Sequence, residues 1–369
     1  MAPTDAAADR SGCPYNGLPE KAFFRNDTLR RGDLALQPDP VLSFTPATRV
    51  MSAGSCFAAR IADYIRRSGV TYLSSDDRIA TDDAVREESP NLFSLRYGNI
   101  YTARHLLQLL QRAAGELAVA PPVTQDSNGR YRNLLRPSVL SYASPTLLLA
   151  DDAAHLRNVA AVIREANVFI FTLGLTEYWM ELHSSLALPS TPGCGDGPYD
   201  PARHRFHNAS LEEVVDELQQ SIDLLHRLNP ALHVLLTLSP VPLVATYTRV
   251  SAIEATFYSK SLLRQAIAVA CASRPRVSYF PSYEIITNPH VIAQNFAPDM
   301  RSVSDAGVAR VMAHFRARYL PAAASDEIVA IPLLDSLSGS PAPSSHSVQI
   351  DPVCDEENIW TSYLHRKGA

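Results

Sequence analysis

The sequence has few cysteines and no cluster of metal-binding residues. Its five cysteines are spread over 369 residues, and none forms a Cys-x-x-Cys pair or lies near histidines at the spacing of a zinc site. The eleven histidines include no His-Glu-x-x-His helix. We therefore expect no metal site, no disulfide framework and no cofactor, and the free thiols predict a reducing cytoplasm.

The sequence also has no large excess of positive or negative charge and no long apolar segment. Charged residues make up 19% of the chain and the formal net charge is −5, so no basic field exists to attract nucleic acid. No apolar run reaches the about 18 residues that cross a bilayer, and we expect no membrane span. Residues 1–10, which are rich in Ala and Asp, lack the basic and apolar regions of a secretory signal. These features are typical of a cytoplasmic enzyme or binding protein.

Short apolar segments alternate with segments of helical periodicity. Strands are expected at 49–53 and 70–73, and three continuous apolar runs that end in Gly or Pro, at 167–174, 233–240 and 277–281, are typical of strands buried on both faces of a sheet. Helices are predicted at 57–65, 102–114, 153–165, 211–228, 257–272 and 304–318. This order predicts an α/β fold with a doubly wound, mostly parallel five-stranded sheet, helices on both faces and flavodoxin-like layering.

Composition divides the chain into three parts. Residues 1–45 are Pro-rich and are expected to wrap irregularly onto the domain formed by 46–320. Residues 321–369 form a linker-like extension, whose stretch Ile359–Leu364 could dock as a tail. The insertion at 184–208 contains a Gly/Pro-rich stretch, Pro192–Pro198, that is too rich in these residues for regular structure and could rim a site.

The turn Gly54-Ser55-Cys56-Phe57 is the leading candidate for a reactive centre. It joins a buried strand to a helix, and ligands of such sheets bind at the carboxyl ends of the strands. A helix N-terminus offers free N–H groups and a positive dipole end, which lower the pKa of a thiol and stabilise an oxyanion. Alternatively, the small residues only permit tight strand–helix packing.

Several motifs resemble those of one protein family. Gly54-Ser55-Cys56-Phe57-Ala58 matches the letters that name the GSCFA family, and the chain is similar to it from about residue 13 to 320. Further matching motifs lie at 14–25, 97–102, 171–177, 239–243, 258–261 and 279–284. The GSCFA family in turn resembles the SGNH/GDSL hydrolases. This resemblance implies an SGNH-like α/β fold and acyl-group chemistry.

The resemblance also implies roles for individual residues. Cys56 stands where the SGNH hydrolases have their serine nucleophile, with Ser55 as the other candidate. Gly98, followed by Asn99, is similar to the second-block glycine whose N–H group contributes to the oxyanion hole. Gly174-Leu175-Thr176-Glu177 is similar to the third block, although Thr176 offers a hydroxyl where the family has an asparagine amide.

The last block departs from the SGNH pattern. Asp299-Met300-Arg301-Ser302 matches Asp-x-x-His, so Ser302 stands where the general base should be. A serine nucleophile needs a base to remove its proton, whereas a cysteine at a helix N-terminus depends less on a base because its thiolate forms more easily. Substitute bases are Lys260 and His290, and Glu177 or Glu284 could act as a base or orienting group; an ordinary structural role is the alternative for each.

Two classes of function follow. The first is an acyl hydrolase or acyltransferase that uses Cys56, or else Ser55, on a small-molecule or carrier-bound acyl substrate. The second is a non-catalytic SGNH-like binding module that has lost the histidine. The sequence does not name the substrate.

Overall fold

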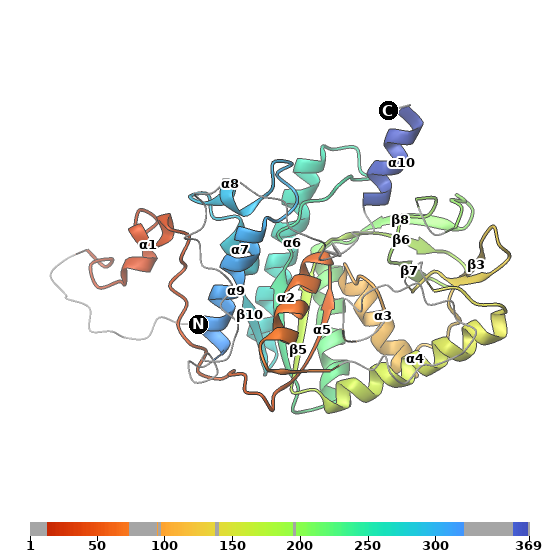
Figure 1. Ribbon diagram of the computed structural model, residues 1–369, viewed down its shortest axis with the longest axis horizontal. Helices are drawn as coiled ribbons and strands as arrows, with labels where there is room; N and C mark the ends of the chain where they lie inside the picture. Colours follow the sequence, from red (N-terminus) through yellow and green to blue (C-terminus); the bar gives the residue numbers. More distant parts are fainter. Residues whose placement is uncertain are drawn as a thin grey trace, which may run out of the picture.

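The computed structural model describes residues 13–73, 94, 97–136, 140–194, 197–320 and 357–367. Its central sheet has five parallel strands (Figure 1), in the order β10-β9-β5-β1-β2. The strands are β1 (Arg49–Gly54), β2 (Thr71–Tyr72), β5 (Val168–Leu173), β9 (His233–Leu238) and β10 (Val277–Phe280). Numbered along the chain, this is the 2-1-3-4-5 order of flavodoxin-like folds. The predicted α/β fold and parallel sheet are confirmed.

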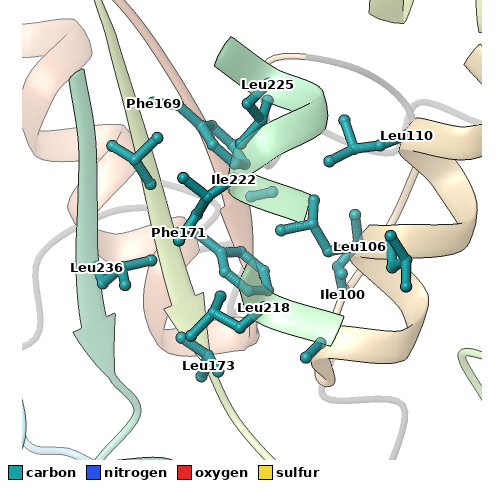
Figure 2. Packing of buried hydrophobic residues seen from close by; sticks show 14 of the residues in the cluster. Ile100, Leu106, Leu110, Phe169, Phe171, Leu173, Leu218, Ile222, Leu225 and Leu236 are labelled. Atoms are coloured by element: carbon teal, nitrogen blue, oxygen red, sulfur yellow. The ribbon is translucent and has the colours of Figure 1, made fainter. Parts of the chain in front are cut away.

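Helices cover both faces of the sheet because its strands are apolar on both sides. Phe169 and Phe171 of β5 point into one core, and Val168 and Ile170 point into the other. The first face is covered by α3 (Ala103–Ala113), α4 (Pro145–Glu165), α5 (Leu211–Leu228) and α6 (Ala252–Ser273). The second is covered by α2 (Cys56–Arg67), α7 (Ser282–Ile286) and α9 (Asp305–Tyr319). Figure 2 shows how β5 packs against α3 and α5 in the first core.

Side-chain caps mark the N-termini of α4 and α5. Ser210 accepts the N–H of Glu213, and the Glu213 carboxylate accepts the N–H of Ser210, so α5 begins with a capping box. The helix α4 begins at Pro145, eight residues before the predicted start at 153, since Ser144 caps it and proline suits the first turn.

A smaller antiparallel sheet follows β5 in the chain. It has the order β7-β6-β8 and contains β6 (Glu177–Glu181), β7 (Leu186–Leu188) and β8 (His204–Asn208). Two of its strands lie inside the insertion at 184–208, which therefore has more regular structure than its glycines and prolines suggested. The described part of 192–198 is irregular, as predicted. A hairpin of β3 (Val123–Gln125) and β4 (Tyr131–Asn133) lies beyond α3.

The N-terminal segment lies against the second core. It contains η1 (Glu20–Ala22) and α1 (Asp27–Arg30), and its Phe44 ring stacks 5.6 Å from Tyr319 of α9. The short helix α8 (Ile292–Asn295) precedes α9, and α10 (Glu357–Lys367) ends the chain near β6 and β8 (Figure 1). Residues 321–356 of the predicted linker lie outside the described residues. No helix in the described part of the chain has the length and hydrophobicity of a membrane span.

Candidate functional site

The candidate site lies at the carboxyl ends of β1 and β5. The chain leaves β1 toward β2 on one side and crosses to β5 on the other, so the strand order reverses between β1 and β5. Open α/β sheets bind their ligands at such a switch point. Four segments meet here: the turn after β1, residues 97–101, the turn after β5, and the middle of α6.

The turn after β1 is built around Gly54. Its φ of +144° favours glycine, and a Cβ at this position would lie 2.6 Å from the carbonyl oxygen of Thr172 on β5. Ser55 follows as the N-cap of α2 and is only 2% exposed, yet its Oγ has no hydrogen-bond partner in the part of the chain that is described. Cys56 is the first residue of α2, where backbone N–H groups are free.

Residues 97–101 join the two strand ends. Gly98 has a φ of +68°, which allows the chain to bend before Asn99. The N–H of Ile100 donates to the carbonyl of Gly54 over 2.9 Å, and the carbonyl of Tyr101 accepts the N–H of Gly174 over 2.8 Å. The structure thus brings the two predicted oxyanion residues, Gly98 and Asn99, beside the Gly54 turn.

Gly174 fits between Ser55 and Lys260. A Cβ at Gly174 would lie 3.4 Å from Cβ of Ser55 and 3.3 Å from the carbonyl oxygen of Tyr101. On its other side, the carbonyl of Gly174 accepts a hydrogen bond of 2.7 Å from Nζ of Lys260. Lys260 is 2% exposed, so α6 supplies a buried lysine next to Gly174. Of the two substitute bases predicted from the sequence, Lys260 is the one that reaches this site.

Thr176 is buried at the same edge, and its polar groups are already paired. Its N–H donates to Oγ of Ser259 over 3.2 Å, and its hydroxyl donates to Oδ1 of Asn208 over 2.7 Å. The hydroxyl proton of Thr176 is therefore held by Asn208 rather than pointed at a ligand. Ser259 belongs to the motif at 258–261, but nothing in the sequence connects Asn208, at the end of β8, with Thr176.

A cavity of about 340 Å³ lies near this site, and neither Gly54 nor Ser55 lines it. Tyr101 and Leu175, which adjoin the Gly54 turn, form one part of its wall. Trp179 lies in another part and contacts Tyr247 and Phe206, with ring centroids 4.8 and 5.7 Å away. Trp179 is 9% exposed, so it both packs against its neighbours and lines the cavity.

Glu177 places a carboxylate at this cavity. Its Oε1 accepts the hydroxyl of Thr246 over 2.6 Å, and its Oε2 accepts the N–H of Tyr247 over 3.2 Å. Burial raises the pKa of Glu177 above its ordinary value, and these two hydrogen bonds oppose the shift. The sequence places Glu177 in the third block, as a binding residue or as a base or orienting group, and its carboxylate suits the recognition of a hydrogen-bond donor.

The last predicted block lies apart from the turn. Asp299 and Ser302 are exposed, and they bond to each other, with Oγ of Ser302 donating to Oδ2 of Asp299 over 2.6 Å. The Ser302 hydroxyl and the N–H of Arg301 hold the pKa of Asp299 below its usual value. Among the described residues, neither side chain has a polar contact with Ser55, Gly174 or Lys260.

The other candidate bases also have partners elsewhere. His290 is exposed, and its ring lies 5.0 Å from that of Phe24. The Glu284 carboxylate accepts hydrogen bonds from Arg264 and from the hydroxyl of Tyr279. Within the described ranges, no three His, Cys, Asp or Glu side chains gather as metal ligands would.

Residues 49–315 match the GSCFA family, and this range runs from the first residue of β1 into α9. No curated protein matches the chain.

Proposed function

The chain belongs to the GSCFA family, and on that premise we propose that it is an acyl-group hydrolase or acyltransferase whose reaction takes place at the turn after β1. The observation that carries the proposal is the position of this turn. It begins helix α2 at the switch point of the sheet, with Lys260 behind Gly174 and a cavity beside Tyr101 and Leu175.

In the proposed reaction, Cys56 is the nucleophile. Its thiolate attacks the carbonyl carbon of an acyl donor and forms a C–S bond, and the alcohol, thiol or amine leaves with a proton from solvent. Water or an acceptor amine or hydroxyl then attacks the thioester, releases the acyl group and restores the thiolate. The N–H groups of Cys56 and Gly98 would hold the oxyanion of both steps.

Two features favour Cys56 over Ser55. Oγ of Ser55 is buried, and among the described residues no base accepts its proton. A serine without such a base is a weak nucleophile near neutral pH, whereas the N-terminus of a helix stabilises a thiolate. Lys260, which donates to the Gly174 carbonyl, would add to that stabilisation when its amine is protonated. Lys260 would therefore act electrostatically, and the exposed Asp299 and Ser302 would have no part in proton transfer.

The proposed substrate is a small-molecule or carrier-bound acyl compound. The cavity walls are largely apolar and aromatic, which suits an acyl group, and Glu177 adds one acceptor for a polar group. We also propose a cytoplasmic location, because Cys13, Cys194 and Cys271 are all free thiols.

The test is the mass of the intact protein after incubation with p-nitrophenyl acetate. We expect a single acetyl adduct that is lost in Cys56→Ala and kept in Cys13→Ala, a matched control at an exposed thiol. Ser55→Ala should keep the adduct because, within the described residues, the Ser55 hydroxyl makes no capping hydrogen bond to α2. Loss of the adduct in Ser55→Ala together with its retention in Cys56→Ala would transfer the nucleophile to Ser55.

The second candidate is a non-catalytic binding module. It is favoured by the separation of Asp299, Ser302 and His290 from the turn in the described structure, which removes three of the predicted catalytic and binding groups from the site. Under this alternative, the wild-type protein forms no adduct, and carboxylic acids bind equally well to the wild type and to Cys56→Ala.

A further inference from the structure

The cavity has one wall from a distant part of the chain. Ile359, Ser362 and Arg366 of α10 line it, whereas its other described wall residues lie between 101 and 247. The spacing of these three residues, three and then four positions apart, places them on one face of the helix. The aromatic rings of Trp360 and Tyr363 lie outside that face, are each 49% exposed, and stack 5.4 Å apart.

An ion pair attaches the first turn of α10 to the domain. Glu357 pairs with Arg301, whose side chain is 16% exposed. Arg301 is held by its own loop, because its N–H donates to Oδ1 of Asp299 over 2.9 Å and Ser302 donates to the same carboxylate. The Asp299–Ser302 turn, which resembles a block of catalytic residues, thus holds the arginine that binds α10.

The attachment is weak compared with the rest of the fold. Glu357 is 48% exposed, and an ion pair so accessible to water contributes little to stability. In α10 only Ile359, Ser362 and Leu364 are half-buried, and its other residues are exposed. The helix therefore has few contacts to lose when it leaves the cavity.

We propose that α10 is a displaceable wall of the cavity and that it limits the length of the acyl group accepted there. The cavity under the docked helix is about 340 Å³, near the lower end of the range for small-molecule sites, which favours short acyl chains. Displacement of α10 removes Ile359 from the wall and admits longer chains. The identity of the ligand rests on the proposed acyl chemistry, whereas the docking of α10 does not.

The two tryptophans of the chain allow the docking to be measured without turnover. Trp179 lies in the cavity wall and Trp360 lies on α10, so in a Trp360→Phe background the emission comes from Trp179 alone. In that background, Ile359→Asp should raise the acrylamide quenching constant of Trp179 at least about twofold, because a charge replaces half-buried apolar surface. His365→Asp, at an exposed position of the same helix, is the matched control and should leave quenching unchanged.

A charge exchange tests the anchor independently of Ile359. Arg301→Glu should also raise the quenching of Trp179, and adding Glu357→Arg to it should restore the wild-type value. If neither Ile359→Asp nor Arg301→Glu changes the quenching of Trp179, the docking of α10 on the cavity is refuted.

The length limit is measured by binding. Butyrate and decanoate are titrated against the Trp179 emission, and Ile359→Asp should improve decanoate binding relative to butyrate about tenfold, a shift expected when a steric wall is removed. An unchanged ratio despite increased quenching would overturn the role of α10 in specificity. If binding follows the prediction but no variant forms an acyl adduct, the proposed reaction fails and this inference stands.

Discussion

Gly54 shows how one residue fixes the geometry of the candidate site. Its φ of +144° and the distance of 2.6 Å from a built Cβ to the Thr172 carbonyl oxygen leave no room for a side chain. We expect Gly54→Ala to lower the free energy of unfolding by about 2–5 kcal/mol, the sum of backbone strain and overpacking. Urea denaturation followed by circular dichroism measures this change.

Gly69 supplies the matched control for Gly54. It also has a positive φ, of +77°, but nothing lies within 4 Å of a built Cβ. Gly69→Ala should therefore show only the cost of the left-handed backbone, about 1–2 kcal/mol. Equal losses in the two variants would mean that the contact with Thr172 does not constrain the turn.

Glu177 makes the stability of the protein depend on pH. Burial raises its pKa above the ordinary value of 4.5, so the folded state disfavours the ionised form. Below pH 4.5 the carboxyl is protonated in the folded and unfolded chains alike; as pH rises above it, the unfolded chain releases the proton first and stability falls. Relative to Glu177→Gln, the wild type should lose stability until the pH passes the raised pKa.

Urea denaturation of both proteins over this pH range measures the effect. The constant difference caused by changed hydrogen bonds to Thr246 and Tyr247 cancels when only the pH dependence is compared. Parallel stability curves for the wild type and Glu177→Gln would contradict the raised pKa.

At the scale of elements, helix α6 fixes residues 174–176, which connect β5 of the central sheet to β6 of the smaller sheet. Two consecutive residues of α6 bond to this connection. Ser259 accepts the N–H of Thr176, and Lys260 donates to the carbonyl of Gly174. Ser259→Ala leaves the N–H of Thr176 without its acceptor in a buried place, and should cost about 1–3 kcal/mol. Chemical denaturation measures the loss.

Ser261 lies on the exposed side of α6 and controls for the change in helix propensity. Ser261→Ala should alter stability by less than about 0.5 kcal/mol, as expected for an exposed position. An equally small change in stability for Ser259→Ala would show that the hydrogen bond from Thr176 to Ser259 does not fix the connection to α6.

At the scale of the whole molecule, the sequence predicts the layers of the fold well. Val168–Leu173 and His233–Leu238 are continuous apolar segments because each strand is buried on both faces, and this signal is local. The capping residues of α5 are equally local, since Ser210 and Glu213 lie three positions apart.

The walls of the site were predicted only in part. The insertion at 184–208 and the stretch Ile359–Leu364, which were expected to rim a site and to dock, both contribute to the cavity wall, but the residues they meet were not predicted. Asn208 meets Thr176 across 32 residues, and α10 reaches the cavity from the end of the chain, so their positions depend on tertiary packing. The short strand β7 has no polar alternation to reveal it, because all three residues are buried. The Asp299–Ser302 block was predicted from its place in the sequence, whereas the structure puts it in an exposed turn that contacts α10.

The pairing of β1 with β5 also has a consequence for the order of folding. The Gly54 turn takes its shape against Thr172, and the N–H of Arg49 bonds to Asn167, 118 residues along the chain. During synthesis, the neighbours that define the turn emerge long after the turn itself. Contacts between such distant segments form slowly because a large loop must close first. The nascent chain therefore carries Cys56 until β5 has been synthesised, and only then can its helix terminus and the end of β5 assemble into a site.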